Sequence, residues 1–235
     1  MRLQITVQDM ENNMGKFKVV EMFSSINGEG QKAGQLAYFV RFAGCNLRCS
    51  YCDTMWANEK NVPFLLMSEE EIYEKIKESN IHNITLTGGE PLLQQNIDRL
   101  LKLLSRDESL NIEIETNGSI DIKELKKISD KISFTLDYKL PGSGMDSFMN
   151  MDNYAVIGKN DTVKFVVSDK NDLDKTKQII EKYKLTDKTA VYISSSFNSI
   201  KPEQIVEYML KENMNGVRLQ LQMHKYIWEP DRKGV

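Results

Sequence analysis

Three cysteines, Cys45, Cys49 and Cys52, lie within eight residues, and the chain contains no others. A protein that uses cysteine as a small core residue scatters it, and one stapled by disulfides favours an even number. Three thiolates spaced Cys-x3-Cys-x2-Cys suit a 4Fe–4S cluster in which one iron has no protein ligand. Clusters that only carry electrons are held by four cysteines. The spacing therefore predicts a 4Fe–4S cluster that does chemistry at its open iron.

Two other interpretations of these cysteines stay open. A structural zinc site with three cysteines and one histidine usually takes its ligands from two separated pairs. The chain has two histidines, His82 and His224, and neither lies near the cysteines in the sequence. The alternatives are a non-catalytic zinc or redox-sensing scaffold and cysteines that bind no metal.

A second polar motif, Thr-Gly-Gly-Glu-Pro, occupies residues 87–91. Its glycines would allow a ligand to approach the backbone closely, and Glu90 could accept a hydrogen bond from an ammonium group. Taken alone, the same residues would suit a simple turn that closes a strand. Together with the cysteine loop (residues 45–52), they indicate an amino-acid-like ligand held beside the cluster.

The elements that must position these motifs alternate between strand-like and helix-like patterns. Strands are predicted over residues 37–42, 83–86 and 111–115, among others, and Ser68 with Glu71 predicts a capping box at one helix start. Repeated strand–helix units favour a parallel sheet with right-handed crossovers. We expect an α/β fold: a partial, open (β/α) barrel with about six or seven mostly parallel strands, fewer than the eight of a closed barrel.

This fold would bring the motifs to one edge of the sheet. In open parallel sheets, ligands bind at the carboxyl ends of the strands, where the connecting loops gather. The cysteine loop and the Gly-Gly-Glu-Pro motif each follow a predicted strand. So do residues 115–118 (Glu-Thr-Asn-Gly) and 137–139 (Asp-Tyr-Lys). All four motifs are therefore expected on the same rim.

Composition limits the classes of function. The chain has 235 residues, of which 40% are apolar, so it can bury a substantial core. Its formal net charge of −3 gives no sign of the positively charged surface that binds nucleic acid. No apolar stretch is long enough to span a bilayer. We expect a cytoplasmic protein with no nucleic-acid or membrane partner, in which thiolates stay reduced. Residues 1–15 are predicted to be a loose extension before a single domain over residues 16–235.

The spacing of the three cysteines, with Tyr51 before the last of them and Gly-Gly-Glu-Pro downstream, resembles that of the radical S-adenosylmethionine (SAM) enzymes. The resemblance implies that the open iron chelates the amino and carboxylate groups of SAM. One electron then cleaves the sulfonium and yields a 5′-deoxyadenosyl radical that abstracts hydrogen. In such enzymes the cofactor does the difficult chemistry, while the protein orients the reactants and excludes water.

Further motifs narrow the resemblance. From about Phe17 to the C-terminus the chain is similar to the 7-carboxy-7-deazaguanine synthase family, through residues 23–30, 41–45, 52–54, 115–119, 139–144 and 222–226. Members of that family convert 6-carboxy-5,6,7,8-tetrahydropterin to 7-carboxy-7-deazaguanine and ammonia on the route to queuosine. The resemblance implies a radical ring contraction assisted by Mg2+, with a small-molecule pterin substrate and a flavodoxin or ferredoxin-type electron donor. A homodimer is also expected.

Where the motifs match, the resemblance implies the same residue roles in this chain as in the family. The substrate would be bound by Ile26, Asn27, Gly28, Glu29, Arg41 and Thr87. SAM would be bound by Tyr51, Cys52, Asp53, Gly89, Glu90, Asp137, Tyr138 and Lys139. Thr54 matches the residue that places Mg2+. Arg41 would receive the substrate carboxylate, because a planar guanidinium can bind a carboxylate with two parallel hydrogen bonds.

The chain departs from the family pattern at two places. Asn27 stands where the family often has glutamine, and Asp137-Tyr138 stands where many members have Ser-Pro. A glycyl-radical enzyme activase of the same superfamily is the alternative enzyme. An activase must admit a protein loop, whereas a site with Asn27 and Arg41 suits a small anionic heterocycle.

Overall fold

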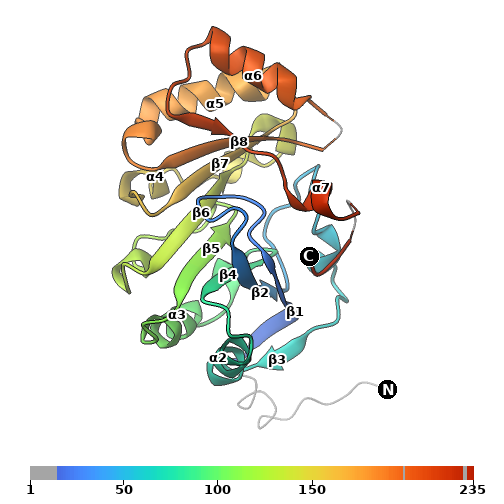
Figure 1. Cartoon of the computed structure of the whole chain (residues 1–235), viewed down its shortest axis with the longest axis vertical. Coiled ribbons are helices and arrows are strands. Elements are labelled where there is room, and N and C mark those ends of the chain that lie inside the picture. The colour runs from blue at the N-terminus through green and yellow to red at the C-terminus, as the bar shows by residue number, and fades with distance from the viewer. Residues whose placement is uncertain (1–14, 198, 230–231) are drawn as a thin grey trace.

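The computed structural model describes residues 15–197, 199–229 and 232–235. Within these residues one nine-stranded sheet has the strand order β3-β1-β2-β4-β5-β6-β7-β8-β9, and helices cover its outer face (Figure 1). The strands are β1 (Phe17–Ile26), β2 (Leu36–Phe42), β3 (Leu65–Met67), β4 (Asn83–Gly88), β5 (Asn111–Thr116), β6 (Ile132–Tyr138), β7 (Thr162–Val167), β8 (Ala190–Ser195) and β9 (Val217–Leu219). The helices are α2 (Glu69–Glu78), α3 (Ile97–Ser105), α4 (Asn153–Val156), α5 (Lys170–Tyr183), α6 (Pro202–Lys211) and α7 (His224–Ile227).

The predicted open, mostly parallel sheet is confirmed. The run from β2 through β4 to β9 is parallel throughout, while β1 pairs antiparallel with both β2 and β3. The parallel part agrees with the expected six or seven strands, and the antiparallel strands bring the total among the described residues to nine. β3 has three residues, which is too short a run to produce a recognisable alternation of apolar and polar residues.

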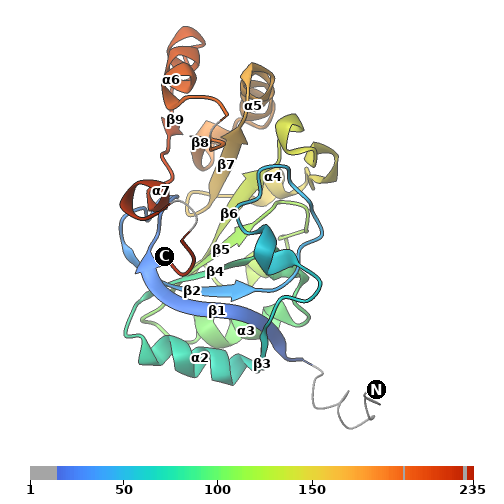
Figure 2. The same ribbon diagram turned by 90° about the vertical axis from the view of Figure 1, so that its right-hand side faces the viewer.

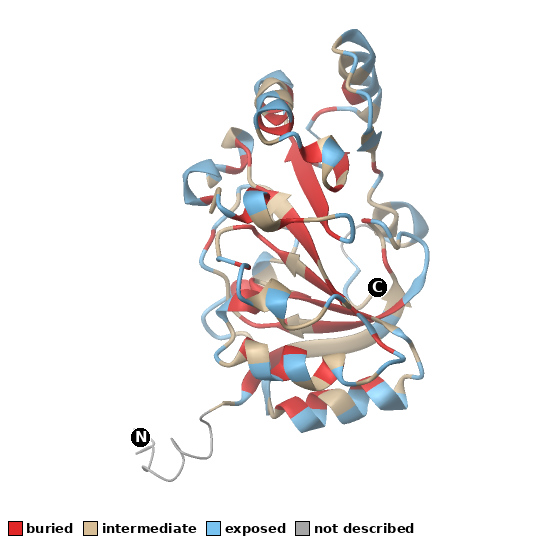
Figure 3. Ribbon diagram, turned by 90° about the vertical axis from the view of Figure 1, so that its left-hand side faces the viewer, coloured by how far each residue is buried: buried red, intermediate tan, exposed pale blue. Residues whose placement is uncertain are grey.

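The two faces of the sheet differ in chemistry because side chains alternate along each strand. Apolar residues on β4, β5 and β6 face the helices and are buried: Ile84, Leu86, Ile112, Ile114, Phe134 and Leu136. The alternate positions of the same strands carry polar side chains: Thr85, Thr87, Glu113, Glu115, Thr135 and Asp137. The hydrophobic core therefore lies between the sheet and the helices (Figure 3), and the inner face of the barrel is polar.

The helix α2 shows how local sequence fixes an element on the outer face. The side chain of Ser68 accepts a hydrogen bond from the Glu71 backbone N–H (3.2 Å), and the Glu71 carboxylate accepts one from the Ser68 N–H (2.7 Å). This is the predicted capping box, which satisfies two N–H groups at the helix start. Ile72 and Ile76 on the inner side of the helix are fully buried. None of the helices in the described part of the chain is long and apolar enough to cross a bilayer.

A loop bridges the open side of the barrel. Residues 27–35, which we call the closing loop, connect β1 to β2 and reach the far end of the sheet. The Gly30 N–H donates to Oε1 of Gln220 after β9 (2.9 Å), and the Gln31 side chain donates to the Asp161 carbonyl before β7 (2.8 Å). Figure 2 shows the end of β1 beside α7. The sheet stays open, but the closing loop completes the wall around its interior.

Candidate active site

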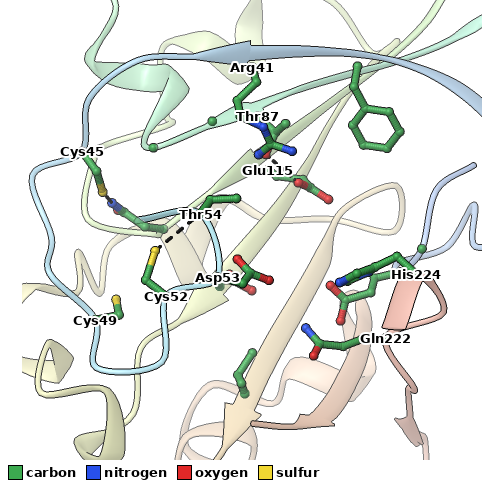
Figure 4. A pocket seen from close by; sticks show the side chains of 18 of the residues that line it. Arg41, Cys45, Cys49, Cys52, Asp53, Thr54, Thr87, Glu115, Gln222 and His224 are labelled. Atoms are coloured by element: carbon green, nitrogen blue, oxygen red, sulfur yellow. Dashed lines mark hydrogen bonds between the residues drawn. The ribbon is translucent and has the colours of Figure 1, made fainter. Parts of the chain in front are cut away.

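A cavity of about 450 Å³ occupies the inner face of the sheet at the carboxyl ends of the parallel strands. This volume is within the range of small-molecule sites. The three cysteines lie on one side of the cavity, Arg41 with Thr87 and Glu115 on a second, and Gln222 with His224 on a third (Figure 4). The rim expected from the sequence is therefore the mouth of one cavity.

The cysteine loop is held against the loop that follows β6. The Ser50 N–H donates to the Ser143 carbonyl (3.1 Å), and the Ser50 hydroxyl donates to the Gly142 carbonyl (2.8 Å). The Asn117 side chain, at the end of β5, donates to Sγ of Cys45 (3.5 Å). The three cysteines are free and partly exposed, so their thiols are available to a ligand in the cavity.

Gly89, which follows β4, is required by the packing of the protein itself. The Gly89 N–H donates to the Phe42 carbonyl (3.1 Å), and the Glu90 N–H donates to the Gly44 carbonyl (2.8 Å). A Cβ on Gly89 would lie 2.1 Å from the Gly44 carbonyl oxygen and 2.0 Å from Oδ1 of Asn58. Such contacts are impossible, so only glycine allows this loop to pack against the start of the cysteine loop.

Glu90 lies behind the cavity wall. It is fully buried, and its carboxylate accepts hydrogen bonds from the backbone N–H groups of Leu92 (3.0 Å) and Asn117 (2.7 Å) and from the Thr116 hydroxyl (2.9 Å). Burial raises the pKa of Glu90 to about 7, although these hydrogen bonds oppose the shift. Glu90 therefore ties the end of β5 to the loop after β4, and its carboxylate does not line the cavity.

Two further residues predicted to contact ligands also lie outside the cavity lining. Asn27 is buried, and its Oδ1 accepts a hydrogen bond from the Thr85 hydroxyl (2.8 Å). Tyr138 points to the helix side of β6, where its ring packs against Tyr154 and Phe165 with centroids 5.9 and 5.5 Å away. The alternation of side chains along β6 explains the second case, because Asp137 takes the inward position.

The other predicted site residues come together around the cavity. The lining includes Ile26, Gly28, Glu29, Arg41, Cys45, Cys49, Tyr51, Cys52, Asp53, Thr54, Thr87, Gly89, Asp137 and Lys139. They come from the closing loop, from β2 and the cysteine loop, and from the ends of β4 and β6. Segments far apart in the sequence thus meet at one site.

Ion pairs cross the floor of the cavity. The Asp137 carboxylate lies 2.9 Å from the Lys139 ammonium and 3.2 Å from that of Lys164. Burial alone would raise the pKa of Asp137, but the two lysines outweigh it and hold this pKa below its usual value. Burial likewise opposes the charge on Lys139, yet Asp137 raises the pKa of that lysine. Both residues are therefore ionised in the protein.

Glu115 lines the cavity near Arg41 and Thr87 (Figure 4) and has a strongly perturbed environment. Its Oε2 accepts a hydrogen bond from the Thr87 hydroxyl at 2.7 Å. Burial raises the pKa of Glu115 to about 7, Lys164 opposes the shift, and the nearby Glu113 adds to it. Near neutral pH this carboxyl group can therefore either donate or accept a hydrogen bond.

Comparison with known proteins shows the family of this chain. The model of the radical SAM superfamily matches residues 39–138. The 7-carboxy-7-deazaguanine synthase of Clostridium acetobutylicum is 54% identical over 219 residues, which cover 93% of this chain and 99% of that protein. The chain belongs to the 7-carboxy-7-deazaguanine synthase family. The synthase of Leptospira interrogans is 37% identical, over 94% of this chain and 98% of that protein.

A solved structure agrees on the fold. The crystal structure of QueE from Escherichia coli superposes with a TM-score of 0.71 and covers 89% of this chain and 95% of that chain, at 20% sequence identity. At that identity the likeness concerns the fold alone. Membership of the radical SAM family implies a 4Fe–4S cluster and SAM as cofactors.

The residues present fit that cluster. In the described part of the chain, no three His, Cys, Asp or Glu side chains are close enough together to hold a single metal ion. Figure 4 instead places the three thiols around the cysteine loop, with His224 on a different side of the cavity. Three thiolates spread along one wall suit the separate irons of a cubane, and Cys45, Cys49 and Cys52 would then leave one iron without a protein ligand.

Several lining residues were not predicted to have a role. They include Glu21, Phe23, Trp56, Glu115, Lys164, Lys233 and Val235. One signal was available for Lys164, which is the charged residue inside the otherwise apolar run Val-Lys-Phe-Val-Val. Gln222 and His224 also line the cavity and belong to the motif at residues 222–226, whereas Lys233 and Val235 carry no local signal, because only the fold of the whole chain brings them to the cavity.

Proposed function

We propose that the chain is a radical SAM lyase that converts 6-carboxy-5,6,7,8-tetrahydropterin to 7-carboxy-7-deazaguanine with release of ammonia. The observation that carries the proposal is the shared cavity, in which three thiols face a polar pocket formed by Arg41, Thr87 and Glu115. The 7-carboxy-7-deazaguanine synthase of Clostridium acetobutylicum aligns over nearly its whole length, which supports the assignment.

The cysteine side would hold the cofactors. Cys45, Cys49 and Cys52 would bind the cluster, and the bound cluster with SAM supplies the radical that abstracts hydrogen from the substrate. The Tyr51 hydroxyl donates to the Val166 carbonyl on β7 (3.2 Å), and burial raises its pKa to about 12. Tyr51 thus stays protonated and holds the cysteine loop to the sheet.

The remaining cofactor contacts would come from residues on the same side of the cavity. Asp53, Gly89, Asp137 and Lys139 line the cavity next to the cysteines and would surround SAM. Asp137 stays a carboxylate, so it can accept hydrogen bonds from hydroxyl or ammonium groups. Glu90 would act indirectly, by holding the loop that carries Gly89.

The opposite side would hold the pterin. The Arg41 Nε–H donates to Glu21 (2.7 Å), which orients the guanidinium, and the guanidinium lies 5.9 Å from the centre of the Phe23 ring. Its two terminal nitrogens are then the donors that a substrate carboxylate would meet. Glu115, held by Thr87, can exchange hydrogen bonds with the amide and amine groups of a pterin. Ile26, Gly28 and Glu29 would line the far edge of the ring, with Asn27 supporting them from behind.

Mg2+ would arrive together with the substrate. Thr54 lines the cavity, and its hydroxyl lies 3.8 Å from Sγ of Cys52. One neutral hydroxyl is a weak ligand, and Mg2+ in proteins keeps several waters and takes oxygens from its substrate. Thr54→Val should therefore remove the stimulation of turnover by Mg2+ and leave the iron content unchanged. Equal stimulation of this variant and the wild type would contradict the assignment of Thr54.

The partners belong to the same proposal. An electron must enter from outside, and a flavodoxin or ferredoxin-type carrier is the kind of donor that we expect. A homodimer and a cytoplasmic location complete the proposal. Sedimentation of the intact chain tests the first of these two expectations, and cell fractionation tests the second.

The proposed function is tested with anaerobically reconstituted protein. About four irons and four sulfides per chain are expected, because the cluster is a cubane. With SAM, a reductant and carboxytetrahydropterin, the protein should form 7-carboxy-7-deazaguanine, identified by its mass, and an equal amount of ammonia. A reconstituted protein that cleaves SAM but leaves the pterin unchanged would favour another radical SAM activity, such as a glycyl-radical activase. A single tight zinc without sulfide would favour the non-catalytic scaffold.

A further inference from the structure

Lys164 occupies a central position on the inner face of the barrel. It lies in the middle of β7, and only 8% of its surface is exposed. Its ammonium donates to Oε2 of Glu29 at 2.8 Å and lies 3.2 Å from Oδ1 of Asp137. One buried cation thus contacts two carboxylates, one from the closing loop after β1 and one from the neighbouring strand β6.

The two carboxylates belong to different parts of the cavity. Glu29 sits in the closing loop, which precedes β2 and faces the proposed pterin side. Asp137 ends β6 and is paired with Lys139 on the proposed SAM side. β7 lies next to β6 in the sheet, with Lys164 directly opposite Asp137 in the register. Lys164 is therefore the side chain through which the closing loop meets the cofactor side.

The burial of these charges makes the contact strong. A buried carboxylate without a partner is strongly destabilised, so removing one member of such a pair affects the geometry of the others. The Ser194 hydroxyl donates to Oε1 of Glu29 (3.2 Å), which adds only a neutral hydrogen bond. Without the ammonium, Glu29 and Asp137 would repel each other across the floor of the cavity.

We propose that Lys164 is a positioning residue that couples the two ligand sites, because its ammonium fixes Glu29 beside the pterin and Asp137 beside SAM in one geometry. The assignment of a ligand to each carboxylate rests on the proposed function. The tether between the closing loop and β7 does not, because it is a property of the unliganded chain.

The first test measures this tether without any ligand. Hydrogen exchange of peptides that cover residues 27–35 is compared between the wild type and Lys164→Met. The matched control is Lys177→Met, because Lys177 also contacts two carboxylates, Glu181 on the outer helix α5 (3.7 Å) and Glu212 directly after α6 (2.8 Å). In Lys164→Met the closing loop should exchange about tenfold faster or more, with α3 unchanged, because a buried charged contact has been removed. The control should leave the closing loop as in the wild type.

The second test measures coupling between the sites. In the reconstituted enzyme, the 5′-deoxyadenosine released per deazaguanine formed reports how often SAM is cleaved without productive hydrogen transfer. This ratio does not depend on the fraction of folded protein. Lys164→Met should raise it about tenfold or more, because a small displacement of the reactants strongly affects a reaction that needs close alignment. Lys177→Met should leave it unchanged.

The outcomes separate this proposal from the proposed function. A wild-type enzyme that does not convert the pterin overturns the proposed function, while the exchange test of the tether stands. Unchanged exchange in the closing loop, or an unchanged ratio with an active wild type, overturns the role of Lys164. If Lys164→Met does not fold, Glu29→Gln removes the same charged contact from the other side. Faster exchange of residues 27–35 in that variant supports the tether, and wild-type exchange overturns it.

Discussion

On the cysteine wall of the cavity, backbone hydrogen bonds between loops act together with side chains, whereas on the opposite wall the contacts that join the closing loop to Lys164 on β7 and to Ser194 on β8 are made by side chains. The cysteine wall comprises the loops after β2, β4 and β6, and its contacts include the bonds from Gly89 to Phe42 and from Ser50 to Ser143. The closing wall comprises the closing loop, the inner sides of β7 and β8, and the C-terminal residues. Its contacts include pairs of side chains, such as Glu29 with Lys164, a side chain with the backbone, such as Gln220 with Gly30, and one long backbone bond from the Met223 N–H to the Gly28 carbonyl (3.5 Å).

This difference explains which parts of the cavity can be predicted from the sequence and which cannot. Backbone contacts between short loops require particular residues at close spacing, and these appear as motifs in the sequence. Side-chain contacts join residues more than a hundred positions apart, such as Glu29 and Lys164, and leave no local pattern.

The largest expected effect is on the cysteine wall. Cys49→Ala should abolish the cluster and all activity, because two thiolates cannot hold a cubane whose fourth iron must stay open. Iron and sulfide analysis after anaerobic reconstitution checks this result, and circular dichroism shows whether the fold is kept. Substantial activity in this variant would contradict the assignment of the three cysteines as the cluster ligands.

The second prediction concerns the junction of the two walls. Arg41→Lys should lower kcat/KM for the pterin about a hundredfold, because the ammonium cannot form two parallel hydrogen bonds with a carboxylate. SAM cleavage and iron content should stay close to those of the wild type, since Arg41 lies away from the cysteines (Figure 4). Steady-state kinetics at low substrate check this prediction. Undiminished kcat/KM would mean that Arg41 does not bind the substrate carboxylate.

Particular residues show how far the sequence alone leads. The cysteine loop, the Gly-Gly-Glu-Pro turn and the inward position of Asp137 follow from motifs that end predicted strands, and the structure brings them to one rim. Tyr138 was expected at the cavity, yet strand alternation after Asp137 turns it outward. Glu90 has the expected place in the chain, but its carboxylate is occupied by N–H and hydroxyl groups from the end of β5. Such partners depend on the register of neighbouring strands, which the sequence pattern does not define.

The third prediction uses the perturbed acid between the two walls. Burial raises the pKa of Glu115 to about 7 in the folded chain, well above that of the unfolded chain. The unfolded chain therefore loses this proton first, so the carboxyl destabilises the fold increasingly from about pH 4.5 to pH 7. Between pH 5 and pH 8 the free energy of unfolding of the wild type should therefore fall by about 2 kcal/mol more than that of Glu115→Gln, which has no carboxyl group to ionise. Urea denaturation of the cluster-free protein at both pH values checks this result.

A matched change at an exposed acid controls for general pH effects. Glu124 pairs with Lys127 on the surface, far from the cavity floor, and most of its side chain is exposed. Glu124→Gln should show the same pH dependence as the wild type. If Glu115→Gln behaves in the same way as this control, Glu115 is ionised in the folded chain at an ordinary pH, and the cavity floor is more hydrated than its burial indicates.

The smallest effect is expected where the two walls meet at the surface. The Lys233 ammonium, in the C-terminal part of the closing wall, lies 4.1 Å from the centre of the Trp56 ring beside the cysteine loop. Because Lys233 is exposed, this cation–π contact should contribute less than about 1 kcal/mol. Lys233→Ala should therefore shift the melting temperature only slightly and change the fluorescence emission of Trp56. The control is Lys182→Ala, which removes a similar contact with Tyr183 on α5 and should leave that emission unchanged. A loss of turnover in Lys233→Ala comparable to that of Arg41→Lys would show that the C-terminal residues of the closing wall act in the site itself.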